Sequence, residues 1–298
     1  MPMDRIVLLP DTQLYTQGTA AGELATTQIY TCDWLAAHAT ERRYVGLAQV
    51  GDISADGTVA STWMVSHMFL DQIVAAMPTW IATGNHDGTH DGASSEFTAA
   101  YPLSARSYLT SLDGETSENA WGTVAISGET WLVISLEWGP RDSILTLAGA
   151  VLAANPTTPA IIVVHAYLAS DGALFDWSGR HEMYNPHQST FPDGHTPNDG
   201  GEIWRKLVEL HSNVKLVLCG HDIGPRATLK QVRSDGSWCW AVLCGHADDR
   251  IEYAGTDARD SFLEIGVDVS NRQFDVLSMG VWTPRVNGRV LLPMDSTT

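Results

Sequence analysis

Short apolar runs alternate with segments of helical periodicity over the first two-thirds of the chain. Runs rich in Val, Ile and Leu predict strands, and segments with apolar residues three or four positions apart predict helices. Gly128 and Glu129 form the predicted turn of a β-hairpin. The predicted strands are 5–10, 44–50, 79–83, 123–127, 131–136, 159–164 and 214–219, and the predicted helices are 22–39, 58–76, 142–154 and 201–211.

The pattern changes after residue 220, where strands follow one another with no predicted helix between them. Parallel units followed by antiparallel hairpins predict an α/β fold of two mixed sheets packed face to face, with helices outside. We find no domain boundary, so residues 1–298 are expected to form a single domain in which 170–200 is a long active-site loop. The later strands are 227–233, 238–244, 262–269 and 273–278, with turn pairs such as Asp235-Gly236 and Ser270-Asn271.

The composition is that of a globular protein, with 44% hydrophobic and 17% charged residues. No apolar run approaches the roughly 20 residues that a membrane helix needs, and the N-terminus lacks a signal-peptide pattern, so we expect no membrane partner. The net charge of −18 disfavours tight non-specific binding to nucleic acid and favours small substrates. Four cysteines are expected to be buried free thiols in a reducing compartment, which favours a cytoplasmic location: Cys32, Cys219, Cys239 and Cys244.

Five of the apolar runs end in the same way, with a potential metal ligand directly after the strand or one small residue later. In α/β sheets, ligands and catalytic groups collect beyond the carboxyl ends of the strands, so these side chains are expected to form a cluster. Taken singly, an aspartate after a strand is often a turn residue, and a histidine there can be a core residue. The five residues are Asp11, Asp52, Asn85, His165 and His221.

Carboxylate, amide and imidazole donors without thiolate suit Mn²⁺, Fe or Zn²⁺ better than Ca²⁺ or a structural zinc site. A central aspartate can bridge two ions, which together hold a phosphoryl group and supply a metal-bound hydroxide for in-line attack. Asn85 adds a neutral oxygen ligand, and His86 is expected to stabilise the transition state or to protonate the leaving oxygen. Asp87 is expected to hold the His86 imidazole in its useful orientation.

The series resembles the motifs of the calcineurin-like metallophosphoesterase superfamily, which run D-x-H, G-D, G-N-H-[DE], a lone His and G-H-x-H. The resemblance covers roughly residues 4 to 280, and it implies a four-layer αββα sandwich with two divalent ions. It implies that Asp52 bridges the ions, that Asn85, His165 and His221 complete one site, and that Asp11 binds the other ion. The matching residues are Asp11-Thr12-Gln13, Gly51-Asp52, Gly84-Asn85-His86-Asp87, His165 and Gly220-His221-Asp222-Ile223.

Two residues depart from these motifs, because Gln13 and Ile223 stand where the superfamily has histidines. Both missing imidazoles belong to the same ion, which keeps Asp11, Asp52 and the amide oxygen of Gln13. An oxygen-only site of this kind favours Mg²⁺, Mn²⁺ or Ca²⁺ over zinc, or is partly empty. The sequence offers two substitutes for the ligand lost at Ile223, which are His246 and Asp222, although Asp222 is expected to point away.

The predicted function is therefore a metallophosphoesterase that hydrolyses small phosphodiester or phosphomonoester substrates. Arg180 or His181, in the loop after the His165 segment, is expected to bind the substrate phosphate, and Trp177 or Tyr184 to stack on a base or sugar. A loop packed by its own aromatic residues is the alternative. Two other functions stay open: a nuclease, and a catalytically weak binding or structural module that retains the fold.

Overall fold

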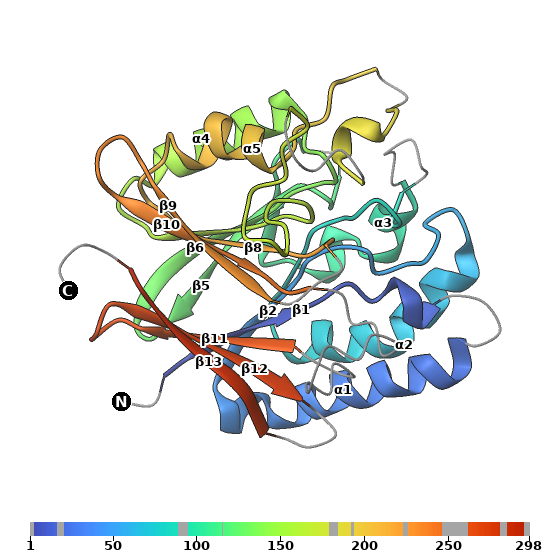
Figure 1. Ribbon diagram of the computed structural model, residues 1–298. Helices are drawn as coiled ribbons and strands as arrows, with labels where there is room; N and C mark the ends of the chain where they lie inside the picture. The colour runs from blue at the N-terminus through green and yellow to red at the C-terminus, as the bar shows by residue number, and fades with distance from the viewer. Residues whose placement is uncertain are drawn as a thin grey trace.

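Two mixed β-sheets lie face to face in the computed structural model, with helices on their outer faces (Figure 1). This arrangement confirms the predicted α/β sandwich of two mixed sheets flanked by helices. The structure describes residues 3–16, 21–88, 95–114, 116–178, 184–191, 194–222, 226–245, 262–280 and 285–294.

The first sheet has the order β13-β12-β11-β1-β2-β3. Strands β1, β2 and β3 are parallel to one another, whereas β11, β12 and β13 are joined by antiparallel pairing. Strand β13 was not predicted, because its apolar residues are interrupted by Asn287 and Gly288. The bounds are β1 Arg5–Leu9, β2 Tyr44–Gln49, β3 Thr79–Ile81, β11 Phe262–Asp268, β12 Gln273–Gly280 and β13 Arg285–Pro293.

The second sheet has the order β4-β5-β6-β7-β8-β10-β9. Its four central strands, β6, β7, β8 and β10, are parallel, and β4, β5 and β9 pair antiparallel at its two sides. The predicted hairpin is formed by β5 and β6, but its turn is Ser127-Gly128 rather than Gly128-Glu129, because Glu129 already pairs with Ile126. The bounds are β4 Leu109–Ser111, β5 Ala120–Ile126, β6 Glu129–Ser135, β7 Ala160–Val163, β8 Val214–Cys219, β9 Ala227–Val232 and β10 Trp238–Leu243.

Each sheet is covered on its outer face by its own pair of helices (Figure 1). Helices α1 (Ala21–Arg42) and α2 (Ala60–Ala76) pack on the first sheet, and α4 (Asp142–Ala154) packs on the second. Helix α5 (Gly200–Ile203) continues as a π-helix over Trp204–Val208, where a single helix had been predicted. Two short elements, α3 (Ser95–Ala100) and β4, were not predicted, because segments this short carry little periodicity.

Apolar side chains from both sheets interdigitate in the layer between them. This inner core includes Leu8, Val50, Trp131, Leu218 and Phe274, all of them buried. Strands that are covered on both faces read as continuous apolar runs rather than as alternating patterns, which is why the central strands were predictable. The four cysteines are buried and free, as expected. Within the described residues, no helix is both long enough and apolar enough to span a membrane.

A buried carboxylate joins α1 to the first sheet. Glu264 on β11 has a fully buried side chain, and it accepts a 2.5 Å hydrogen bond from the hydroxyl of Tyr44 on β2. Arg42 Nη2, at the end of α1, lies 2.7 Å from Glu264 Oε1, and Arg5 Nε lies 3.2 Å from Oε2. The two guanidinium groups and the phenol therefore satisfy a charge that would otherwise be costly to bury.

Glu264→Ala should lower the free energy of unfolding by about 3 kcal/mol, because it leaves a buried phenol and two cations without their acceptor. Urea denaturation followed by circular dichroism measures this change. Arg289→Ala is the matched control, since Arg289 pairs with Asp275 on the same sheet but is largely exposed, and it should destabilise the protein clearly less than Glu264→Ala. Equal effects of the two substitutions would contradict the structural role of Glu264.

Candidate metal centre

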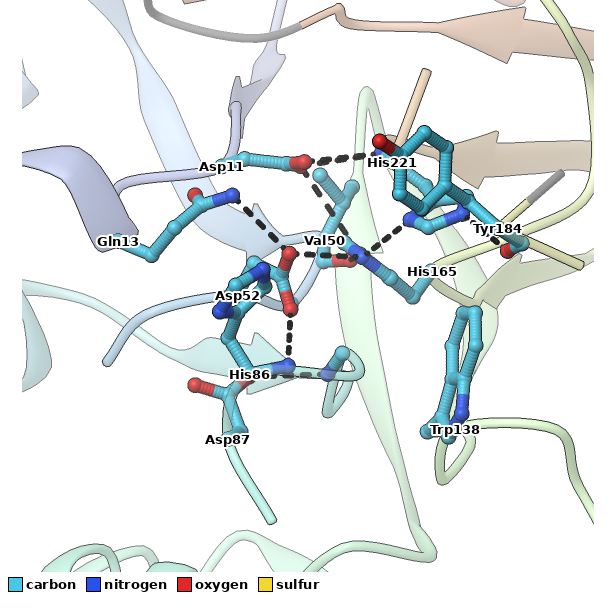
Figure 2. Close-up of polar contacts among 12 residues, drawn as sticks. Asp11, Gln13, Val50, Asp52, His86, Asp87, Trp138, His165, Tyr184 and His221 are labelled. Carbon is cyan, nitrogen blue, oxygen red and sulfur yellow. Dashed lines mark hydrogen bonds and ion pairs between the residues drawn. The ribbon is translucent and has the colours of Figure 1, made fainter. Parts of the chain in front are cut away.

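The carboxylate of Asp52 lies at the centre of a polar cluster at the carboxyl ends of the parallel strands (Figure 2). Asp52 follows β2 and is buried, with a left-handed backbone (φ 54°) after Gly51 (φ 102°). Its Oδ2 lies 3.3 Å from Nε2 of His165, and its Oδ1 accepts a 2.8 Å hydrogen bond from the backbone N–H of His86. The backbone conformation therefore directs one carboxylate at ligands from both sheets.

Two imidazole rings face each other beside Asp52, from the ends of β7 and β8. Nδ1 of His165 lies 2.7 Å from the carbonyl oxygen of Val50, and Nε2 of His221 lies 2.7 Å from that of Tyr184. A carbonyl only accepts, so both of these nitrogens carry a proton and donate it. The neutral rings are then left with lone pairs on His165 Nε2 and His221 Nδ1, which are 3.1 Å apart.

Two lone pairs at this distance repel each other unless a proton or a cation lies between them. A carboxylate oxygen of Asp52 and ring nitrogens of His165 and His221 all lie within 4.8 Å of one another, which suits coordination of one ion. The backbone carbonyls that hold the two rings also determine which ring nitrogen is free to bind an ion. Metal-binding histidines usually donate their other ring nitrogen to a contact of this kind.

Asn85 follows β3 and directly precedes His86, whose backbone N–H donates to Asp52. The Oδ1 of Asn85 is buried without a hydrogen-bond partner among the residues that the structure describes. A buried amide oxygen without a donor is costly, and a cation would remove that cost. The cluster of Asp52, His165 and His221 suits a divalent ion, and Asn85 stays a predicted further ligand.

Without a metal, protonation would take over the role of the cation. Burial disfavours a charged His165, but the carboxylates of Asp52 and Asp11 outweigh it and raise the pKa of His165 to about 9. Burial and the charge on His165 lower the pKa of His221 to about 3. Although burial opposes it, the same imidazolium holds the pKa of Asp52 well below its usual range. Beyond the protons of the two neutral rings, the cluster thus carries one additional proton, on His165, which a metal has to displace.

The residues of the second predicted ion are arranged differently. Both carboxylate oxygens of Asp11 lie within hydrogen-bond distance of the backbone N–H of His221, at 3.2 and 3.1 Å. Gln13 places its Nε2 3.1 Å from Asp52 Oδ2, so its amide donates to the carboxylate that would bridge the ions (Figure 2). Two polar side chains are thus present, but Asp11 is not one of the described residues that converge on the cluster of Asp52, His165 and His221.

His86 and Asp87 have separate roles, which corrects one expectation. The carboxylate of Asp87 is fully buried and accepts backbone hydrogen bonds from Ile53, Ser54 and Gly84, at 2.7 to 2.9 Å. The ring of His86 instead places Nδ1 3.0 Å from the carbonyl of Ala55. Asp87 therefore does not orient the His86 ring; it ties the turn after β2 to the turn after β3.

Three backbone donors favour an ionised Asp87, yet burial and the nearby Asp52 carboxylate outweigh them and raise the pKa of Asp87 to about 7. The carboxylate of Asp87 has a structural role, because the turns that carry Asp52 and Asn85 both donate backbone hydrogen bonds to it. The sequence could not separate this function from a contact with the neighbouring His86, since both follow from the same four-residue motif.

Sequence reasoning missed Trp138 as part of this site. The indole packs beside both imidazoles, with ring centroids 5.5 Å from His165 and 5.0 Å from His221, and its Nε1 donates to Ser189 Oγ (Figure 2). A buried aromatic wall limits the movement of the rings and their access to water. Its position in the sequence could have identified it, because Trp138 follows the parallel strand β6 just as the candidate ligands follow their own strands.

The described part of the long loop contacts the site through the main chain of Tyr184. Tyr184 contributes its carbonyl to His221, while its side chain is exposed. The carboxylate of Asp222 accepts from Ser170 N at 2.6 Å, so it holds the start of the loop. Trp177 packs against His187, which favours a loop packed by its own aromatic residues.

Four residues named by the sequence lie outside the described residues: Arg180, His181, Ile223 and His246.

Two glycines provide the space into which the carboxylates fit. A Cβ added at Gly84 would lie 2.1 Å from Asp52 Oδ1, and one at Gly220 would lie 2.3 Å from Asp11 Oδ1. Neither distance is compatible with a side chain, so the glycines of the two motifs are required by close approach.

Comparisons with known proteins identify the fold. No family model and no curated protein matches the sequence. Among solved structures, a purple acid phosphatase from yellow lupin (Lupinus luteus) seeds is similar over 98% of this chain, with 12% identity and a TM-score of 0.57. This chain spans about half of that protein, 54% of its length.

A second similar structure is GAP50, described as the anchor in the inner membrane complex of Plasmodium. The match covers 99% of this chain and 90% of that chain, with 11% identity and a TM-score of 0.50. Identities this low establish a shared fold, and the two similar proteins carry different descriptions. The function has to follow from the residues of the site.

Gly84→Ala should abolish high-affinity Mn²⁺ binding, because the new methyl group would displace the Asp52 carboxylate. Isothermal titration of the metal-free protein measures the affinity, and circular dichroism verifies the fold. Gly149→Ala in α4 is the matched control, since its Cβ would meet the end of the His211 side chain and, at ordinary contact distance, Leu207, and it should bind Mn²⁺ like the wild type. Retained affinity in Gly84→Ala would exclude the geometry described for Asp52.

Mn²⁺ affinity should rise by up to about tenfold per pH unit between about pH 6.5 and 9, because binding displaces the proton of His165. In the metal-free protein, this raised pKa gives stability that is fully present below pH 6.5 and is lost as the pH rises through about 9. Titrations in two buffers of different ionisation enthalpy would detect about one proton released per ion at pH 7.5. Affinity independent of pH over this range would contradict the proposed proton displacement.

Proposed function

We propose that the protein is a metal-dependent phosphoesterase that acts on small phosphodiesters or phosphomonoesters. One observation carries the proposal, the convergence of Asp52 with two imidazoles whose facing nitrogens both lack a proton in the neutral form. Such a set is unfavourable without a cation and well suited to Mn²⁺, Fe or Zn²⁺. The similar fold of a purple acid phosphatase supports the same reaction class by analogy.

The proposed centre is asymmetric, with one ion held by Asp52, Asn85, His165 and His221. When bound, a divalent ion lowers the pKa of a coordinated water and offsets the negative charge of the phosphoryl group. A second ion would depend on Asp11, Asp52 and Gln13, which lack an imidazole, so we propose that it binds weakly. Asp11 helps to hold the main site in either case, because its carboxylate accepts from the backbone of His221.

His86 is the proposed catalytic side chain outside the ligand set. Its backbone N–H donates to Asp52, which places the residue beside the centre, and its Nδ1 donates to the carbonyl of Ala55. That contact leaves Nε2 for the substrate, and the half-buried ring remains accessible. In its protonated form, His86 would donate to a phosphoryl oxygen and then supply a proton to the leaving oxygen.

The substrate is proposed to be small. The net charge of −18 repels a long polyanion, which disfavours the nuclease alternative. Arg180 and His181 remain the proposed phosphate contacts of the loop. Trp138 packs against one side of His165 and His221 and blocks access there, so the substrate would approach from the side of His86.

With added Mn²⁺, the purified protein should hydrolyse bis(p-nitrophenyl) phosphate or p-nitrophenyl phosphate. His86→Ala should lower kcat by about 10² to 10⁴, because it removes the proton donor and leaves the metal ligands intact. The absorbance of the released p-nitrophenolate at about 405 nm gives the rates of the wild type and the variant.

His67→Ala is the control, because His67 lies on α2 and pairs with Asp71 at the surface, away from the centre. Metal binding by His86→Ala, measured in the same preparation, separates lost catalysis from a lost ion. If no phosphoester is hydrolysed with any divalent ion, the phosphoesterase proposal fails and the binding or structural module is favoured. The description of GAP50 as an anchor provides a precedent for such a module on this fold.

A further inference from the structure

Arg226 lies at the same edge of the second sheet as the metal centre, but it belongs to none of the motifs. It directly precedes β9, whose first residue, Ala227, pairs with Leu243 of β10, and Leu243 pairs in turn with Cys219 of β8. One step further toward the edge, the same register aligns Arg226 with Cys244 and Gly220. Arg226 is therefore two strands away from the turn that carries His221.

The side chain of Arg226 is directed toward the centre's side of the sheet. Cys244 belongs to the core between the two sheets, and residues directly opposite each other on neighbouring strands share a face. Burial raises the pKa of the Cys244 thiol, the carboxylate of Asp11 raises it further, and the guanidinium of Arg226 opposes them. The thiol is thus near both charged groups, and the strand register places Arg226 and His221 at the same end of the second sheet.

Among the residues that the structure describes, Nη1 of Arg226 is buried without a hydrogen-bond acceptor, and no carboxylate forms an ion pair with this side chain. Arg233 instead donates to Val208 O and Val214 O, and Arg141 pairs with Glu137. Arg106 also has an unsatisfied Nη1, but it donates through Nη2 to Tyr101 O. A half-buried cation without a partner is unfavourable, so the position of Arg226 suits an anion that arrives from outside the chain.

We propose that Arg226 binds a second phosphate group of the substrate, one that is not hydrolysed. This inference rests on the proposed function, and it specifies the substrate class as a phosphoester with a further phosphate. The guanidinium fork matches two phosphate oxygens, which lysine cannot reproduce. Two strand spacings of about 4.8 Å separate Arg226 from the turn of His221, which leaves room for the part of the substrate that joins the phosphates.

Two matched substrates test this role. Thymidine 5′-(p-nitrophenyl phosphate) has only the reacting phosphate, and its 3′-phosphorylated derivative has a second one. In the wild type with Mn²⁺, kcat/KM should be higher for the derivative, and Arg226→Gln should reduce this preference by about tenfold or more. Arg226→Lys should recover only part of it, because it restores the charge without the fork. Arg205→Gln, at an exposed position on the outer helix, should keep the wild-type preference.

A binding measurement tests the same role without catalysis. Metal-free protein in EDTA should bind thymidine 3′,5′-bisphosphate about tenfold more tightly than thymidine 5′-monophosphate, and Arg226→Gln should lose this difference in isothermal titration. If the wild type hydrolyses no phosphoester, the proposed function fails, while the titration still decides the role of Arg226.

Three outcomes would overturn the assignment to Arg226. The first is an unchanged preference for the second phosphate in Arg226→Gln. The second is an equal loss on both substrates, which would place Arg226 at the reacting group. The third is a lower melting temperature with unchanged preference in both assays, which would make Arg226 a support of the fold.

Discussion

The buried carboxylate of Asp52 imposes the constraint on which the rest of the site depends. A negative charge in this position requires positive charge and hydrogen-bond donors around it. In the absence of metal, His165 supplies the positive charge. The backbone N–H of His86 and the amide of Gln13 supply the hydrogen-bond donors. The left-handed turn at Asp52 and the space left by Gly84 exist because the carboxylate has to reach ligands from both sheets.

Positive charge is distributed unevenly around this carboxylate. The imidazole side brings Asp52, His165 and His221 within 4.8 Å of one another, whereas the Asp11 side offers oxygens and the amide of Gln13. Arg226, whose buried Nη1 lacks an acceptor among the described residues, lies at the same end of the second sheet. The proposed enzyme would thus combine one firmly held ion with a guanidinium for a second phosphate.

Prediction from the sequence succeeded where the physical signal is local. The central strands are apolar on both faces, so their runs were recognisable, and each was followed by its ligand at the same edge of the sheet. Strand β13 and the division of roles between His86 and Asp87 were not predictable in this way. Both depend on neighbours that are distant in the chain, such as the backbone of Ile53 and Ser54 for Asp87.

The sequence by itself determined the two mixed sheets, the ordered series of candidate ligands after their strands and the presence of Gln13 and Ile223 among them. These features follow from apolar runs, turn residues and the chemistry of single side chains. Only the tertiary structure decided which nitrogen each histidine presents, because that depends on the carbonyls of Val50 and Tyr184. It also decided that Trp138 walls the site and that Nη1 of Arg226 has no acceptor in the described chain, since packing between distant segments sets both.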